Sequence, residues 1–326
     1  MRLDQPLLQL PIAFSAQTLA AEVQALPASA WEPHPTGFPG NDAVLLVTPG
    51  GELSQGIEGP MAPTEHLLRC PYIMQVMAEL GGVWGRSRLM GLDPAAEVPA
   101  HVDVNYYWRT HLRIHIPVVT NPEVIFTCGD DSVHMKAGEC WVFDSFQWHD
   151  VQNFGKDKRV HLVLDTVGGE AIWDLLRAAG SPSVEPRQAL PLGQTTVDSL
   201  LFEQVNVPKV MSPWEIRCHM AFITEHLEPD PQSDAVLERL DKFEDAWAAG
   251  WARFGTSDEG IPTYRDLLTA VKRDLVALGV AQISLRNELQ LAMVLDQLIF
   301  QMAIAPATSP ASDAAAQSAG ARQPAS

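Results

Sequence analysis

Alternating polar and apolar positions between residues 109 and 117 predict a β-strand near the middle of the chain. The apolar parity holds Leu112, Ile114 and Ile116. The other parity holds Arg109, His111, Arg113, His115 and Pro117. Successive side chains of a strand point to opposite faces, so one face is apolar and the other carries cations and imidazoles. Such a polar face fits either the solvent side of an edge strand or the interior of a barrel that binds an anion.

A second strand of the same kind is predicted at residues 159–165, RVHLVLD, where the odd positions begin with Arg159. It follows a turn predicted at 153–158 from one glycine and three charged residues. The first ninety residues predict a mixture: a helix over 15–23 with Ser15 as its N-cap, a buried strand at 42–47, a helix at 72–80 and a strand at 86–92.

The pattern changes in the last third of the chain, where apolar residues recur every three or four positions. Helices are predicted at 212–227, 233–254, 263–278 and 284–304, after a helix within 168–180 and a proline-rich linker at 181–193. We therefore expect a β domain over 1–194, a helical domain or layer over 195–304, and a disordered tail over 305–326. The helices are expected to shape a substrate entrance or to form a homo-oligomer.

The composition of the chain limits the kinds of molecule and compartment with which the protein is expected to be associated. The chain has 326 residues and a formal net charge of −18, which argues against nucleic acid and against anionic membranes. No apolar run is long enough to insert into a membrane, and the first residues lack the pattern of a signal peptide. Four scattered cysteines without a Cys-x-x-Cys motif indicate reduced thiols, so we expect a cytoplasmic protein.

The candidate chemistry lies in His101-Val102-Asp103 and in His149. Side chains two apart on a strand share a face, so His101 and Asp103 form a pair that a distant histidine would complete. Two imidazoles and one carboxylate on one side of an ion leave three adjacent positions open, as non-haem Fe(II) oxygenases require. A second His-x-acid pair, His226-Leu227-Glu228, lies near a predicted helix end, where its side chains diverge.

Several motifs occur together between residues 89 and 165, in this order: RLMGLDP, HVD, RIHIPVVTNP, the segment 138–144, WHDVQN and RVHLVLD. In this stretch the chain resembles the aspartyl/asparaginyl β-hydroxylase family of Fe(II)- and 2-oxoglutarate-dependent oxygenases. The resemblance implies a mainly β fold, the double-stranded β-helix (a jelly-roll or cupin-like barrel), with flanking helices and a metal near one mouth. It does not cover the helical C-terminal region.

The resemblance also implies roles for individual residues. His101, Asp103 and His149 would bind Fe(II), and Arg159 would pair with the distal carboxylate of 2-oxoglutarate. Arg113 and His115 would hold the other end of this cosubstrate. The sequence departs from the family pattern at Met90, where a serine that helps bind the cosubstrate would fall, because methionine has no hydrogen to donate.

The expected function is that of a dioxygenase that hydroxylates an unactivated carbon of an amino acid or peptidyl residue. It would use Fe(II), 2-oxoglutarate and O2, and release succinate and CO2. Asn105 and Tyr107 share strand parity with the ligands and are candidates for substrate contact. Two rival classes stay open: a cupin-like metal-dependent hydrolase or isomerase without 2-oxoglutarate, and a non-catalytic protein that binds a small molecule.

Overall fold

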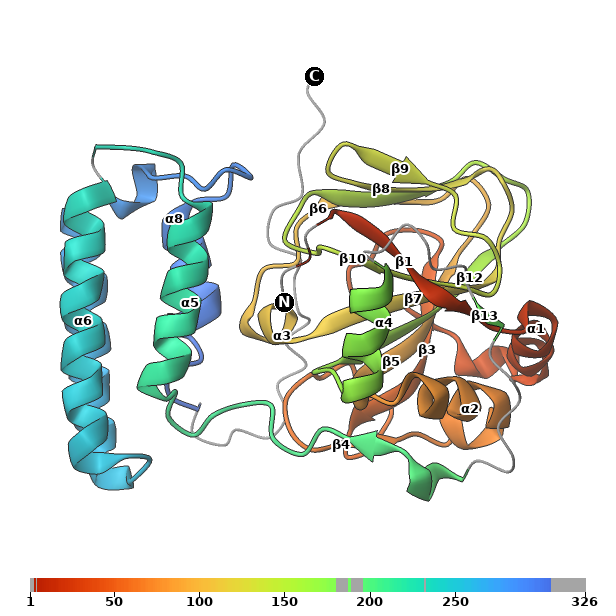
Figure 1. Ribbon diagram of the computed structural model, residues 1–326, viewed down its shortest axis with the longest axis horizontal. Helices are drawn as coiled ribbons and strands as arrows, with labels where there is room; N and C mark the ends of the chain where they lie inside the picture. Colours follow the sequence, from red (N-terminus) through yellow and green to blue (C-terminus); the bar gives the residue numbers. More distant parts are fainter. Residues whose placement is uncertain (1–2, 4, 180–186, 189–195, 232, 306–326) are drawn as a thin grey trace. The chain divides into compact units, whose positions relative to one another are not determined.

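The computed structural model describes residues 3, 5–179, 187–188, 196–231 and 233–305 (Figure 1). The linker predicted at 181–193 and the tail predicted at 305–326 lie almost entirely outside these residues. The chain divides into two compact units. Among the described residues, the β unit comprises those within 1–103 and 110–206, and the helical unit comprises Val104–Arg109 together with those from Val207 to residue 305.

Two sheets make up the described part of the β unit. The larger has ten strands in the order β13-β1-β10-β7-β12-β5-β3-β2, with β14 beside β5 and β4 beside β3. Its strands are β1 Leu7–Ala13, β2 Glu32–Pro33, β3 Asn41–Pro49, β4 Met61–Pro63, β5 Val83–Leu92, β7 Leu112–Val119, β10 Glu139–Phe143, β12 Arg159–Thr166, β13 Arg187–Gln188 and β14 Leu201–Phe202. The smaller sheet has the order β6-β11-β8-β9, from β6 Glu97–His101, β8 Val124–Cys128, β9 Asp131–Val133 and β11 His149–Asn153.

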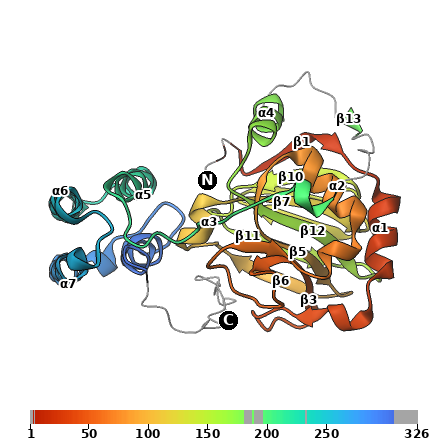
Figure 2. The same cartoon turned by 90° about the horizontal axis from the view of Figure 1, so that it is seen from below.

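The central strands β7 and β12 pair antiparallel, with Leu164 opposite Ile114 and Leu162 opposite Ile116. These four side chains are fully buried and form one apolar face of the large sheet. Helix α1 (Ala16–Ala25) contacts β7 and also α2 (Pro71–Leu80), and Figure 2 shows the two helices beside each other next to this sheet. The alternation predicted from Leu112 onward is therefore confirmed, and the alternate positions of β7 and β12 face the other way, toward the small sheet.

Apolar side chains from both sheets pack together between them. Phe143 of β10 and Leu92 of β5 join Phe126, Cys128 and Val151 of the small sheet in one buried cluster. Two mainly antiparallel sheets that face each other across such a core form a double-stranded β-helix, so the predicted fold class is confirmed.

The helices on the β unit begin where their capping residues predict. Ser15 accepts a hydrogen bond from the backbone N–H of Thr18 at the start of α1. The carboxylate of Glu22 in α1 accepts hydrogen bonds from the first backbone N–H groups of α2, at Tyr72 and Ile73. A third helix, α4 (Glu170–Ala179), contacts β1. Short 3-10 helices at Ala28–Ala30, Leu67–Arg69 and Val197–Ser199 complete the described local structure.

The helical unit packs around aromatic residues. Its elements are α3 Tyr106–Thr110, α5 Pro213–His226, α6 Ser233–Phe254, α7 Ile261–Ala277, α8 Leu291–Leu295, the π-helix η6 Asp296–Phe300, and 3-10 helices at Asp258–Gly260 and Val280–Gln282. Trp247 is fully buried, packs against Tyr264 with the two rings tilted by 41°, and donates a hydrogen bond from its indole N–H to the carbonyl of Met211. Within the described residues, no helix is long and apolar enough to cross a membrane.

Two predictions about local structure are wrong. The strand predicted from residue 109 begins only at Leu112, because residues 106–110 form the helix α3. Tyr106 and Tyr107 are both buried there, so the strand parity that made Asn105 and Tyr107 candidates for substrate contact does not apply.

The helix predicted at 284–304 is also shorter than expected. A tight turn at Glu288, whose φ is positive, is closed by a hydrogen bond from the Leu285 N–H to the Leu289 carbonyl. Helical structure therefore starts only at Leu291.

Candidate metal centre and anion site

The two histidines of the candidate metal site come from neighbouring antiparallel strands. His149 of β11 pairs directly with His101 of β6, so the two side chains point to the same face. Their ring centroids lie 4.2 Å apart. Asp103 follows two residues after His101, where its backbone N–H donates to the Ser145 carbonyl at 2.9 Å. In the part of the chain that the structure describes, these three residues form the one group suited to hold a metal, with all ligand atoms within 4.8 Å of one another.

The hydrogen bonds of the two imidazoles determine which nitrogen can bind a metal. The Nδ1 of His101 lies 2.8 Å from the Pro99 carbonyl, and the Nδ1 of His149 lies 2.9 Å from the Gln147 carbonyl. A carbonyl oxygen only accepts, so each Nδ1 carries the hydrogen and each Nε2 presents a lone pair. Burial, together with the neighbouring His101, lowers the pKa of His149 to about 3. The two imidazoles and the carboxylate fit a divalent metal such as Fe(II).

Arg113 holds the candidate carboxylate ligand in place. Its Nη1 donates to Asp103 Oδ2 at 2.8 Å, and its Nε donates to Asp165 Oδ1 at 2.9 Å. Asp165 lies directly opposite Arg113 on β12. Burial favours the neutral form of Asp103, but Arg113 and the two imidazoles outweigh it and lower the pKa of this carboxyl below its ordinary value. Arg113 therefore orients a carboxylate ligand, and its predicted contact with 2-oxoglutarate stays a prediction.

Arg159 is a buried cation without a protein counter-charge. It starts β12 on the inner face, and only 4 % of its surface is exposed. No described residue forms a hydrogen bond or ion pair with its guanidinium, and its Nε is buried without a partner. Burial lowers the pKa of Arg159 to about 9. A buried guanidinium is costly unless it is paired, so this position fits an anionic group of a ligand.

His115 lies beside this cation in an aromatic setting. Its ring contacts Phe126 and Phe143 edge-on, with centroids 5.7 and 5.2 Å away. Its Nδ1 lies 3.5 Å from the Nδ1 of His161, which is on the same face of β12 as Arg159. Burial, with Arg159 as the next cause, lowers the pKa of His115 well below its ordinary value, so this imidazole is neutral.

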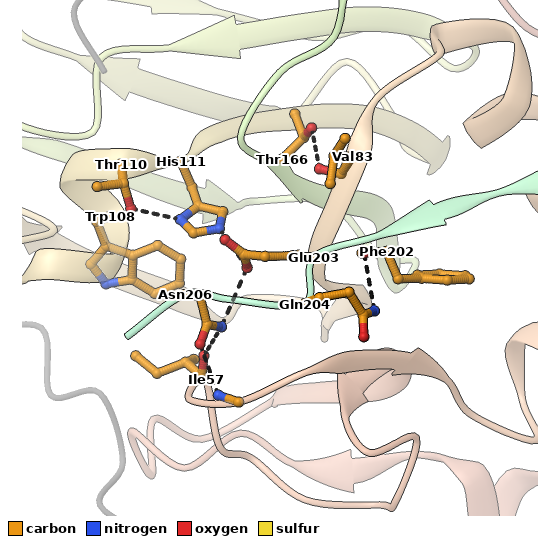
Figure 3. Close-up of polar contacts among 12 residues, drawn as sticks. Ile57, Val83, Trp108, Thr110, His111, Thr166, Phe202, Glu203, Gln204 and Asn206 are labelled. Atoms are coloured by element: carbon orange, nitrogen blue, oxygen red, sulfur yellow. Dashed lines mark hydrogen bonds and ion pairs between the residues drawn. The ribbon is translucent and has the colours of Figure 1, made fainter. Parts of the chain in front are cut away.

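His111 and Arg109, which the pattern placed beside Arg113, have other partners. The Nε2 of His111 lies 3.0 Å from a carboxylate oxygen of Glu203, and its Nδ1 lies 3.1 Å from the Thr110 hydroxyl (Figure 3). Glu203 also accepts a hydrogen bond from Asn206, which donates to the Ile57 carbonyl. His111 thus holds the segment after β14 in place. Arg109, in the helical unit, lies over the ring of Phe222 at 4.1 Å.

Sequence reasoning missed a further basic group on the inner face, in addition to Arg113 and Arg159. Arg88 of β5 lies opposite Val163 of β12, and its Nη1 lies 3.1 Å from the Nε2 of His34. Burial, followed by the charge of Arg88, lowers the pKa of His34 to about 2, so the neutral ring accepts the hydrogen bond. Strand parity could have revealed this residue, because Arg88 and Met90 point to the same face of the strand predicted at 86–92.

A double-stranded β-helix with two histidines and one aspartate gathered on its inner face defines the cupin-like class of metal-binding barrels. Within that class, residues 45–168 match the model of the Aspartyl/Asparaginyl beta-hydroxylase family. The match includes every candidate residue from Arg88 to Asp165 described above. It contains no residue after 168.

A curated relative is similar over part of its length. The chain is 29% identical over 141 residues to L-proline cis-3-hydroxylase 1 from a Streptomyces species, covering 40% of this chain and 47% of the relative. The chain thus matches about half the length of this relative.

Among solved structures, a Pseudomonas putida prolyl-4-hydroxylase is 14% identical, with a TM-score of 0.34 over 50% of this chain and 92% of that one. A 2OG-Fe(II) oxygenase family oxidoreductase from Burkholderia pseudomallei is 11% identical, with a TM-score of 0.31 over 48% of this chain and 93% of that one. Similarity this low does not bear on the reaction.

Proposed function

We propose that the protein is an Fe(II)- and 2-oxoglutarate-dependent dioxygenase that hydroxylates an unactivated carbon of an amino acid or peptidyl residue. The observation that carries the proposal is the combination of two imidazoles and a carboxylate with Arg159, a buried guanidinium without a described partner in the same barrel. A site for a metal alone would not need this cation. A metal that works together with a carboxylate-bearing cosubstrate would.

In this proposal, different residues of the chain bind the metal and the cosubstrate. His101 and His149 would donate Nε2 lone pairs to the ion and Asp103 an oxygen, which leaves adjacent positions for other ligands. Arg159 would bind a carboxylate with two parallel, charge-assisted hydrogen bonds. Fe(II), 2-oxoglutarate and O2, when bound, supply the oxidation and yield succinate and CO2. Phe126 packs against Phe143, and Phe143 packs against the His149 ring, so apolar side chains border the imidazole side of the site.

The charges on the inner face support a substrate that carries a carboxylate. Arg88, Arg113 and Arg159 bring three positive charges, whereas the two carboxylates described beside them are Asp103 and Asp165. A bound metal ion would add further positive charge, and 2-oxoglutarate alone balances only part of it. The similarity to a protein named as a proline hydroxylase agrees with a free amino acid as the substrate.

Binding under anaerobic conditions tests the proposal. Fe(II) and 2-oxoglutarate together should give a weak visible charge-transfer band, and the Arg159→Met variant should lose the band while it retains the metal. Succinate formation is then measured in air across free amino acids, including proline, and short peptides. If wild-type protein binds Fe(II) but gives neither the band nor succinate, the site belongs to a hydrolase, an isomerase or a binding protein instead.

A further inference from the structure

Two buried hydrogen-bonding atoms without a partner lie near each other on the inner face of β12. They are the Nε of Arg159 and the Nε2 of His161, and neither has a hydrogen-bond partner among the described residues. Side chains two apart on a strand share a face, so both project toward the interior. Arg159 is also, after burial, the strongest influence that lowers the pKa of His161, which means that the cation is close to this ring. Buried polar groups are nearly always paired, so two orphans together indicate a missing ligand.

The chemistry of the ring agrees with a donor at this place. His161 is 1 % exposed and neutral, so it carries a single ring hydrogen. Its Nδ1 faces the Nδ1 of His115 at 3.5 Å, and the tautomers of the two rings decide which of these nitrogens donates. When His115 donates, His161 carries its hydrogen on Nε2. Beside a guanidinium, which only donates, the ligand group that satisfies both atoms is a carboxylate.

The position opposite His161 explains why a histidine is needed. Met90 of β5 is its direct partner in the antiparallel pair with β12. Side chains in such a pair approach within about 5 Å, so a hydroxyl at position 90 would reach the same space. The Met90 thioether has no hydrogen to donate.

We propose that His161 is the second donor to the carboxylate that Arg159 binds, taking the place of a hydroxyl donor that Met90 cannot supply. The inference rests on the proposed function, because the carboxylate in question is the distal one of 2-oxoglutarate. It concerns binding of the cosubstrate and assigns no step of the reaction to His161.

Calorimetric titration of the Fe(II)-loaded protein without oxygen tests this assignment. His161→Phe should weaken 2-oxoglutarate binding by about 10- to 100-fold, as expected for the loss of one hydrogen bond to a charged group. His161→Gln, whose amide can donate from a position near that of Nε2, should retain most of the affinity. Fe(II) affinity should be unchanged in both variants. His226→Phe, which changes a histidine bonded to the Phe222 carbonyl in the helical unit, is the control and should bind 2-oxoglutarate like the wild type.

Two further measurements separate a donor from a residue that only fills space. Pyruvate keeps the keto-acid end of the cosubstrate but lacks the distal carboxylate, so its weaker binding should not change in His161→Phe. Met90→Ser introduced into His161→Phe should recover much of the lost 2-oxoglutarate affinity, because it returns a hydroxyl to the opposite strand.

Three results would overturn the inference. Equal losses for pyruvate and 2-oxoglutarate would mean that His161 supports the site as a whole. Wild-type 2-oxoglutarate affinity in His161→Phe, with that affinity lost in Arg159→Met, would refute the role of His161 and leave the proposed function intact. Failure of the wild-type protein to bind 2-oxoglutarate would refute both.

Discussion

Arg113 and Arg159 occupy the same inner face but should respond in opposite ways to replacement by methionine. Methionine keeps a flexible apolar stem of similar length and removes the charge. Arg159 has no protein counter-charge, whereas Arg113 bonds two carboxylates, Asp103 and Asp165. The stability of the metal-free, ligand-free protein therefore separates an arginine kept for a ligand from one that supports the fold.

The expected change in the free energy of unfolding follows, for each variant, from the surroundings of the replaced side chain. Burial lowers the pKa of Arg159 from 12.5 to about 9, which corresponds to about 5 kcal/mol spent on keeping the charge inside the protein. Structural relaxation recovers part of this cost, so Arg159→Met should raise the free energy of unfolding by about 1–4 kcal/mol. Arg113→Met leaves two buried carboxylates without their partner and should lower it by about 3–5 kcal/mol.

Urea unfolding of the metal-free variants, followed by fluorescence, measures both changes under the same conditions. In the Fe(II)-loaded protein, 2-oxoglutarate should raise the unfolding midpoint of the wild type and leave that of Arg159→Met unchanged. A loss of stability in Arg159→Met comparable to that in Arg113→Met would show that Arg159 has a structural partner, and the reasoning would fail.

Three more predictions concern the metal ligands, the cysteines and a hydrogen bond in the helical unit. His149→Ala should abolish Fe(II) binding in a protein that stays folded, whereas His134→Ala should not; wild-type iron affinity by calorimetry in the former would exclude the proposed ligand set. A thiol reagent should label Cys218 alone in the native chain, because the other three cysteines are buried, and all four after unfolding; a second rapidly labelled thiol would contradict the described burial. Tyr106→Phe removes the hydrogen bond from the tyrosine hydroxyl to Glu215 and should lower the unfolding free energy of the helical unit by about 1 kcal/mol, detected by denaturant titration; no change would mean that water replaces the bond.

Local sequence patterns predicted the parts of the fold that depend on residues close together in the sequence. The parity of residues 112–117 identified both faces of β7, and the Ser15 cap located α1. Parity alone failed at α3, because the segment YYWRT has no alternation that distinguishes a strand from a short helix held by distant contacts. The turn at Glu288 was missed for a related reason, since its positive φ is set by the local chain path rather than by an apolar period.

In the candidate site, too, the sequence predicted the features that depend on residues close in the chain and missed those that depend on distant ones. The pair His101 and Asp103 was visible because its spacing is local. The partners of Arg113 were not, because Asp165 is 52 positions away and meets it only through the register of β7 against β12. The pairing of His111 with Glu203, 92 positions apart, likewise depends on the path of the whole chain.

The division of the chain also has a consequence for the order in which the protein can fold during synthesis. Residues 104–109 belong to the helical unit, yet they directly follow Asp103 and precede β7. Their partners there, such as Glu215 and Phe222, leave the ribosome about a hundred residues later. While the chain is being made, the segment after the candidate ligand Asp103 therefore has to wait without its packing partners. A nascent chain stopped after β12 should already contain His101, His149 and Arg159. The segment that follows Asp103 should still lack its packing partners in that chain.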